Sequence, residues 1–229
     1  MSENISNVVL VHGAWADGSS WGGVIWALKS AGINAVAAPI PLTSLADDVA
    51  AVERTLAREK GHTVLVGHAY AGAVIGEVKS DKVKALVYVA ALAPDEGENV
   101  ADVFGRGVPH PKAPKVAPDG DGLMWLPHEA FGEAFAQNAS PEVQELLAAV
   151  QRPLAVSCIT TAVGRPLWRD VPTWYLLAEQ DRMIVKETQA FMSSRMNATV
   201  VSHNVDHLPS LTAQNEVVDI ILAACGEKK

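Results

Sequence analysis

Short apolar runs that alternate with longer amphipathic stretches are the feature that most narrows the fold of this 229-residue sequence. Several runs are apolar at consecutive positions, as expected of strands in a parallel sheet that is covered on both faces. Strands are predicted at residues 7–11, 34–38, 63–66, 83–90, 171–178 and 199–205. Their alternation with helical patterns predicts an α/β fold with a doubly wound, mostly parallel sheet.

The clearest helical pattern spans residues 45–60, with apolar side chains on one face. Ser44 precedes it with Asp47 three residues on, and Gly61 follows it, so both ends carry capping signals. Between residues 95 and 170 the alternation breaks off, and Gly and Pro recur until helical patterning returns at 128–137 and 141–151. We expect residues 1–94 and 171–229 to form the core and residues 95–170 to be an inserted helical lid.

Composition excludes several classes of protein. Hydrophobic residues make up 49% and charged residues 19%, and no apolar run approaches the ~20 residues of a membrane helix. The first seven residues are polar and lack a basic stretch, so a secretory signal is not expected and a cytoplasmic location is. The net charge of −8 argues against nucleic acid as a partner. Cys158 and Cys225 lack metal-ligand spacing, so neither a disulfide framework nor a metal site is predicted.

The segment VLVGHAYAGAVIG, residues 64–76, runs a predicted strand through a tight turn into a helix. A nucleophile elbow has this layout: the apex residue is held in strained backbone, and small neighbours let strand and helix approach closely. Gly67, Ala71 and Gly72 are such neighbours, although Ala71 stands where the commoner pattern has glycine. The apex itself is Ala69, where a serine is usual. Taken alone, the segment is equally compatible with an ordinary strand-to-helix connection.

Another turn follows the first predicted strand, in VVLVHGAW. His12 and Gly13 form it directly after the strand, so a backbone amide beyond it can face the apex of the elbow. The amides of Ala14 and Tyr70 are therefore candidate donors to a negatively charged oxygen. The amide of Tyr70 also lies at the start of a predicted helix, whose dipole favours negative charge.

Two later segments place titratable side chains beyond strand ends. WYLLAEQDRMI carries Asp181 past a buried strand, with Glu179 as a nearby alternative. ATVVSHNVDHLPSLTAQ carries His207 in a loop after the last strand, with Asp206 beside it and His203 as a rival inside the strand. The chain order of apex, acid and histidine is that of an α/β-hydrolase catalytic triad.

Together these segments resemble the α/β-hydrolase superfamily, and most closely its small bacterial esterase-type hydrolases related to plant methylesterases and hydroxynitrile lyases. The resemblance covers nearly the whole chain, through VVLVHGAWADGSSW, VGHAYAGAVI, VYVAALAPDEGE, WYLLAEQD and VDHLPSLTA. It implies that Ala69 is the nucleophile site, Asp181 the orienting acid and His207 the general base. It also implies that the amides of Ala14 and Tyr70 form an oxyanion hole. Substrates in such a family range over esters, lactones, amides and cyanohydrins.

Alanine cannot attack a carbonyl, so we expect the chain with Ala69 to be inactive toward esters. Because the rest of the constellation is retained, we interpret Ala69 as an engineered serine-to-alanine change in a hydrolase of a small, largely apolar carboxylic ester or lactone. Two alternatives stay open. In one, Ala69 is natural and His207 with Asp181 serves a nucleophile-independent lyase or cofactor-free oxygenase. In the other, the scaffold is a ligand-binding protein without activity.

Large side chains near the first strand and in the expected lid are candidates for the wall of an apolar pocket, although packing within the lid itself is the simpler alternative for any one of them. The candidate substrate-binding residues are Trp15, Phe104, Trp125, His128, Phe131 and Phe135. We expect a small-molecule substrate, no cofactor, and neither nucleic acid nor membrane as partner. A homodimer is left open.

Overall fold

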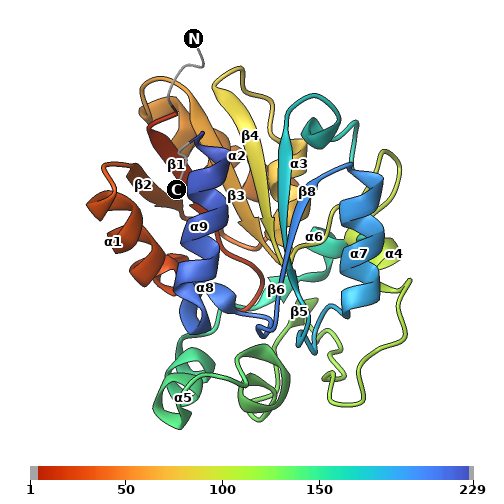
Figure 1. The fold of residues 1–229 in the computed structure, drawn as a ribbon. Coiled ribbons are helices and arrows are strands. Elements are labelled where there is room, and N and C mark those ends of the chain that lie inside the picture. The colour runs from red at the N-terminus through yellow and green to blue at the C-terminus, as the bar shows by residue number, and fades with distance from the viewer. Residues whose placement is uncertain (1–4, 227–229) are drawn as a thin grey trace.

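The computed structural model describes residues 5–226 and contains a six-stranded sheet in the order β2-β1-β3-β4-β7-β8 (Figure 1). Each neighbouring pair in this sheet is parallel, which confirms the predicted doubly wound architecture. The strands are β1 (Asn7–Val11), β2 (Asn34–Ala38), β3 (Thr63–His68), β4 (Val83–Val89), β7 (Thr173–Ala178) and β8 (Thr199–His203). The prediction of a strand from residue 171 was two residues early, because Pro172 has no N–H to donate to the ladder.

Helices cover both faces of the sheet and bury a separate apolar core on each. Helices α1 (Gly22–Ser30) and α9 (Gln214–Ala224) pack together on one face. Helices α2 (Leu45–Arg58), α3 (Ala71–Glu77) and α7 (Lys186–Arg195) contribute to the core of the other. The central strands are therefore enclosed on both sides, which explains their continuous apolar sequence.

Helix α2 begins where its capping signals predict. The side chain of Ser44 accepts a hydrogen bond from the backbone N–H of Asp47 at 3.1 Å. The helix ends at Arg58, before Gly61, which adopts a positive φ of 83°. Its predicted extent to residue 60 was thus two residues too long.

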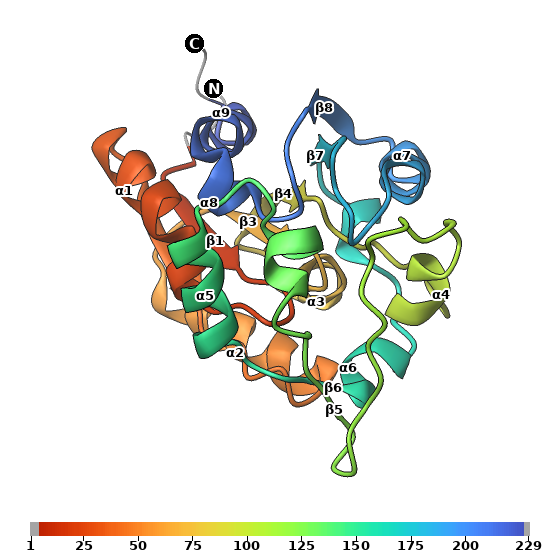
Figure 2. The ribbon, with the colours of Figure 1, turned by 90° about the horizontal axis from the view of Figure 1, so that it is seen from below.

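Residues 95–170 leave the sheet after β4 and return before β7, and Figure 2 views the molecule from their side. The predicted helix at 141–151 is present, whereas the predicted helix at 128–137 is reduced to one π-helical turn. The elements are α4 (Val100–Phe104), β5 (Leu123–Met124), η2 (Phe131–Phe135), α5 (Pro141–Val150), β6 (Leu154–Ala155), α6 (Val156–Thr160) and η3 (Leu167–Arg169). Strands β5 and β6 pair antiparallel in a separate small sheet.

Two short elements complete the chain, η1 (Gly18–Trp21) before α1 and α8 (Pro209–Thr212) before α9. Within residues 5–226, no helix combines the length and the apolar character needed to cross a membrane.

Gly72 allows α3 to approach the segment that follows β4. A methyl group on Gly72 would lie 2.3 Å from the carbonyl oxygen of Leu92 and 3.0 Å from the side chain of Ala91. Both neighbours are buried, and the closer atom is backbone, so neither can move aside cheaply. The small residue predicted at this position of the turn is therefore a packing requirement.

We expect Gly72→Ala to lower the free energy of unfolding by about 1–3 kcal/mol, because the added methyl overpacks this contact. Chemical denaturation with guanidinium chloride measures the change. Gly22→Ala is the matched control, because Gly22 has a φ of −51° and no atom within 4 Å of the new methyl. The control should be neutral or more stable by up to about 1 kcal/mol. Equal stability of the two variants would contradict the close-approach argument.

Candidate active site

Ala69 occupies a strained apex between β3 and α3. Its φ is +50°, in the left-handed region that side chains other than glycine rarely adopt. The turn is held by the Ala69 amide, which donates to the carbonyl of Val89 at 3.3 Å, and by the Ala69 carbonyl, which accepts from the amide of Leu92 at 2.9 Å. Ala69 therefore has the backbone conformation that the elbow pattern predicts.

Asp181 and His207 form a buried pair beyond the ends of β7 and β8. The Asp181 Oδ2 and the His207 Nδ1 are 2.8 Å apart, and neither residue is more than 4% exposed. Because an ionised carboxylate only accepts hydrogen bonds, this contact places a proton on Nδ1. The neutral imidazole then carries its lone pair on Nε2. His207 and Ala69 line the same cavity.

The Asp181 carboxylate is fixed by donors from its own turn as well as by His207. Its Oδ1 accepts from the backbone amides of Met183 at 2.7 Å and Ile184 at 2.9 Å, and its Oδ2 accepts from the Gln189 Nε2 at 3.0 Å. Gln189 is fully buried and also accepts from the amide at the end of β7. Sequence reasoning missed Gln189, since no motif marks a glutamine on the following helix.

The rival carboxylates near this pair are engaged elsewhere, and the rival histidine lies within a strand. Glu179 accepts from the Ser202 hydroxyl at 2.6 Å, and Asp206 accepts from the Thr212 hydroxyl at 2.5 Å. His203 is the last residue of β8, and its backbone carbonyl accepts from the amide of Glu179. The structure thus brings Asp181, and neither rival carboxylate, to His207.

His68 supports the loop that carries His207. Its Nε2 lies 2.6 Å from the backbone oxygen of His207, and the two rings lie 4.8 Å apart. A carbonyl can only accept, so the Nε2 of His68 bears the proton. Burial is the main cause that lowers the pKa of His68 well below 6.5, and it likewise lowers the pKa of His12. Sequence reasoning had assigned His68 no role.

The two residues whose amides are the predicted donors lie at the cavity beside the apex. Ala14 and Tyr70 both line it, and the hydrogen bonds of residues 5–226 include no acceptor for either amide. Gly13 lies directly against the elbow, since a methyl on Gly13 would be 2.9 Å from the Cβ of Ala69. The loop after β1 and the elbow are therefore adjacent, as the sequence predicts.

A buried carboxylate, Asp48, lies behind Tyr70. It accepts from the Tyr70 hydroxyl at 2.7 Å and from the Leu42 amide at 2.7 Å, and the Cys158 Sγ is 3.8 Å away. Burial raises the pKa of Asp48, and the hydrogen bond from Tyr70 is the largest cause that opposes this rise. Burial also raises the pKa of the Cys158 thiol to about 12, so this cysteine stays protonated.

The cavity beside Ala69 has a volume of about 450 Å³ and walls that are mostly apolar. Residues of the 95–170 segment form much of the wall, so this segment lies over the ends of β3 and β8. Of the predicted substrate-binding residues, Trp15 and Phe104 line the cavity. Within residues 5–226, no group of three or more His, Cys, Asp or Glu side chains is arranged to hold a metal ion.

The other four predicted substrate-binding residues lie outside the cavity lining. Phe131 and Phe135 are fully buried and pack edge to face against each other at 5.3 Å, so they belong to the packing of the 95–170 segment. Trp125 is 48% exposed and donates to Asp119, and His128 is exposed beside Glu145. Phe135 still lies 5.4 Å from the His207 ring and so packs against the Asp181–His207 pair.

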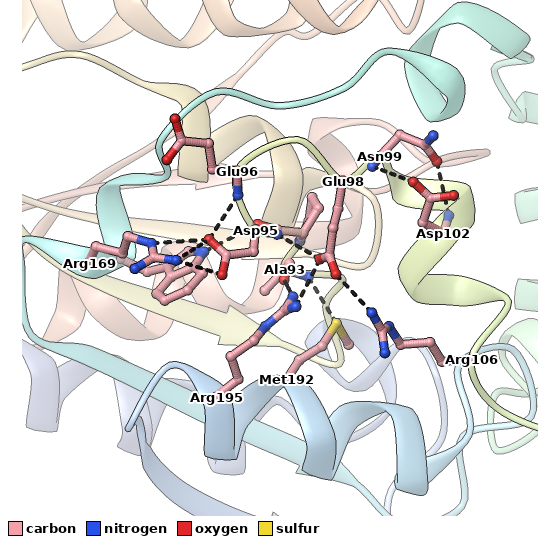
Figure 3. Close-up of polar contacts among 12 residues, drawn as sticks. Ala93, Asp95, Glu96, Glu98, Asn99, Asp102, Arg106, Arg169, Met192 and Arg195 are labelled. Atoms are coloured by element: carbon pink, nitrogen blue, oxygen red, sulfur yellow. Dashed lines mark hydrogen bonds and ion pairs between the residues drawn. The ribbon is translucent and has the colours of Figure 1, made fainter.

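An ion-pair network anchors the start of the 95–170 segment (Figure 3). Glu98 accepts from Arg106 at 2.9 Å and from Arg195 of α7 at 2.8 Å. Asp95 accepts from Arg169 of η3 at 2.7 Å. Because α4 begins two residues after Glu98 and lines the cavity, the network fixes one wall of the site.

A parallel sheet with a strained strand-to-helix turn at the end of its third strand is the architecture of the α/β-hydrolase fold. The chain belongs to the Alpha/beta hydrolase family, whose sequence model matches residues 8–220. It is 24% identical over 246 residues to the alpha/beta hydrolase nvfD of Aspergillus novofumigatus, covering 96% of each chain. It is 30% identical over 124 residues to a carbendazim hydrolyzing esterase of Nocardioides, covering 46% of this chain and 50% of the esterase.

Solved structures share the fold across nearly the whole chain. Polyneuridine aldehyde esterase superposes with a TM-score of 0.82 at 20% identity, covering 96% of this chain and 98% of the esterase. A pyrethroid hydrolase of Sphingobium faniae gives a TM-score of 0.82 at 21% identity, covering 97% of this chain and 98% of the hydrolase. A serine-to-alanine variant of the pyrethroid hydrolase PytH gives 0.79 at 22% identity, covering 96% of each chain. The relatives that carry a named activity are hydrolases and esterases, which supports a hydrolase-type enzyme.

The buried, neutral histidines predict a pH dependence of stability. Because the pKa values of His68 and His12 are lowered in the folded state, the unfolded chain binds more protons below pH 6.5. The contribution of the neutral histidines to the free energy of unfolding is therefore complete above pH 6.5 and is lost as the pH falls below that value. Each histidine contributes about 1.4 kcal/mol of lost stability per pH unit in that range.

Denaturant unfolding between pH 5 and 7.5 measures this slope. His68→Gln should reduce the slope, and it should change the free energy of unfolding less at pH 7.5 than at pH 5. Glutamine retains a side-chain N–H that can reach the His207 carbonyl but does not titrate. His128→Gln is the control, since the His128 side chain is 63% exposed. An unchanged slope in His68→Gln would mean that His68 is not held neutral.

Proposed function

We propose that this site is that of a serine-type hydrolase for a small, largely apolar carboxylic ester or lactone, with alanine at the nucleophile position. The observation that carries the proposal is that Ala69, His207, Ala14 and Tyr70 line one apolar cavity, and that the amides of Ala14 and Tyr70 have no acceptor among the described residues. The strained φ of Ala69 supports it, because an ordinary connection has no need of a left-handed alanine. Residues 1–94 and 171–229 would be the core, and residues 95–170 the lid.

With a serine at position 69, the proposed chemistry follows from the hydrogen bonds already described. Asp181 holds the proton of His207 on Nδ1, which leaves Nε2 free to take the proton of the serine hydroxyl. The serine oxygen then attacks the ester carbonyl, and the amides of Ala14 and Tyr70 stabilise the resulting oxyanion. His207 returns the proton to the leaving alcohol, and water releases the acid by the reverse sequence.

With Ala69, the same site would bind an ester and leave it intact. Alanine is serine without its hydroxyl, so the substitution preserves the turn and opens space at the apex. We propose that Ala69 is a serine-to-alanine change in such a hydrolase, and the fold likeness to a serine-to-alanine variant of a pyrethroid hydrolase is consistent with a scaffold that tolerates this change.

A second candidate function uses the histidine–carboxylate pair alone. The Asp181–His207 hydrogen bond is complete without a serine, so a lyase in which His207 abstracts a substrate proton is compatible with the same geometry. Under this candidate Ala69 is the natural residue. Such an enzyme would gain no ester hydrolysis from a serine at position 69.

We expect Ala69→Ser to turn on hydrolysis of small chromogenic esters such as p-nitrophenyl butyrate. Loss of a triad nucleophile costs several orders of magnitude in kcat, and restoring it should give a gain of at least about 10³-fold. Ala69→Gly is the matched control, since it changes the same strained position without supplying an oxygen. Equal rates for Ala69→Ser and Ala69→Gly would contradict the hydrolase proposal and favour the lyase.

The roles of the buried pair are tested in the Ala69→Ser background. His207→Ala and Asp181→Asn should each remove most of the gained kcat, because one deletes the base and the other disturbs its tautomer. His203→Ala should leave kcat nearly unchanged, since His203 lies within β8. Steady-state kinetics on one ester, with thermal melts to verify folding, measure these effects. An inactive His203→Ala variant would show that the base is misassigned.

A further inference from the structure

The cavity at the proposed active site contains a cationic side chain that the proposed reaction does not use. Lys115, in the loop between α4 and β5, lines the cavity together with its neighbours Ala113, Pro114 and Val116. No Asp or Glu among the described residues is part of the lining, although acidic residues outnumber Lys and Arg 26 to 18 in the whole chain. The charge of the cavity wall is therefore opposite in sign to that of the protein.

The ammonium of Lys115 has no hydrogen-bond or ion-pair partner within residues 5–226. Other cations near the cavity are occupied: Arg106 and Arg195 hold Glu98 (Figure 3). Lys82, directly before β4 at the opposite end of the strands, donates to three backbone carbonyls. Lys115 thus differs from the cations that serve packing of the fold.

Of the acidic residues that flank Lys115 in the chain, Asp119 and Asp102 are held by their own turns, and Asp121 forms no ion pair with Lys115. Asp119 accepts from the backbone amides of Asp121 and Leu123 and from the Trp125 indole. Asp102 accepts from the amide of Asn99 in a capping box at the start of α4 (Figure 3). These contacts leave the Lys115 ammonium available to a group that enters from solution.

We propose that Lys115 recognises a carboxylate on the substrate, at the end remote from the scissile carbonyl. The proposal rests on the proposed ester-cleaving site and names its substrate class: a half-ester of a dicarboxylic acid, or a lactone with a carboxylate side chain. The apolar walls bind the hydrocarbon body of such a molecule, and the exposed ammonium at the rim binds its anionic end while the lysine stem lies along the wall. A charge-assisted hydrogen bond of this kind gives orientation as well as affinity.

Binding to the chain with Ala69 tests this directly, because the ligand is not turned over. The probes are the monophenyl esters of adipic, suberic and sebacic acids, each paired with the same compound methylated at its free carboxyl. Isothermal titration calorimetry at low ionic strength gives Kd for each pair. We expect at least one length to bind about tenfold more tightly as the carboxylate than as the methyl ester, with a preference that weakens as salt is added.

Lys115→Gln should abolish this preference and leave the affinity for the methylated probe unchanged, and Lys115→Glu should reverse it. Lys112→Gln is the matched control, since it removes the same charge three residues away, outside the cavity lining. The proposal would be overturned if the carboxylate and methylated probes bound equally at every chain length, or if both bound weakly. It would also be overturned if Lys112→Gln lost the preference for the carboxylate to the same extent. An equal loss for both probes in Lys115→Gln would overturn it as well, because it would show that the lysine stem only packs.

The outcome is separable from that of the proposed function. If Ala69→Ser stays silent toward esters while the Lys115-dependent preference persists, the hydrolase proposal fails and the carboxylate site stands. If Ala69→Ser cleaves the methylated probes and no preference is found, the hydrolase proposal stands and the carboxylate site fails.

Discussion

The hydrogen bonds that hold Ala69 in the left-handed region are the interactions on which the site depends. The Ala69 amide donates to Val89 at the end of β4, and the Ala69 carbonyl accepts from Leu92 in the segment that follows, so both backbone groups of the apex are bonded to this part of the chain. Parallel pairing of β3 with β4 brings these partners to the apex. The strain of a positive φ, about 1–3 kcal/mol, is thus balanced by the sheet itself, and the small residues around the turn follow from this closeness.

The buried Asp181 illustrates how a charge is kept inside the fold. A carboxylate removed from water is costly unless its oxygens are fully hydrogen-bonded. Two backbone amides of its own turn and the amide group of Gln189 satisfy Asp181, so His207 is one donor among several. The orientation of the carboxylate is therefore fixed by contacts other than the one with His207. The loop of His207 is fixed independently, through the hydrogen bond from His68 to its carbonyl.

Much of the fold was predictable because buried parallel strands and capped amphipathic helices follow local patterns, as the agreement at β1, β2 and the start of α2 shows. The alignment of Asp181 with His207 was predictable from their positions after strands. Partners such as Gln189 and His68 were not, since their roles depend on how loops far apart in sequence meet. In the 95–170 segment, Gly and Pro interrupt the helical period, so inward-packing aromatics such as Phe131 could not be told from cavity-lining ones such as Phe104.

Asp48 connects the irregular 95–170 segment to the turn that carries Ala69 and Tyr70. Its carboxylate joins the amide of Leu42 after β2, the hydroxyl of Tyr70 at the elbow and the thiol of Cys158 in α6. Leu42, itself at a positive φ of 63°, accepts through its carbonyl from the amide of Ala155 in β6. One buried carboxylate therefore connects the residue that follows the apex to two elements of the 95–170 segment. A displacement of α6 would reach the Tyr70 amide through Asp48, which makes the position of this segment part of the geometry of the site rather than a separate cover.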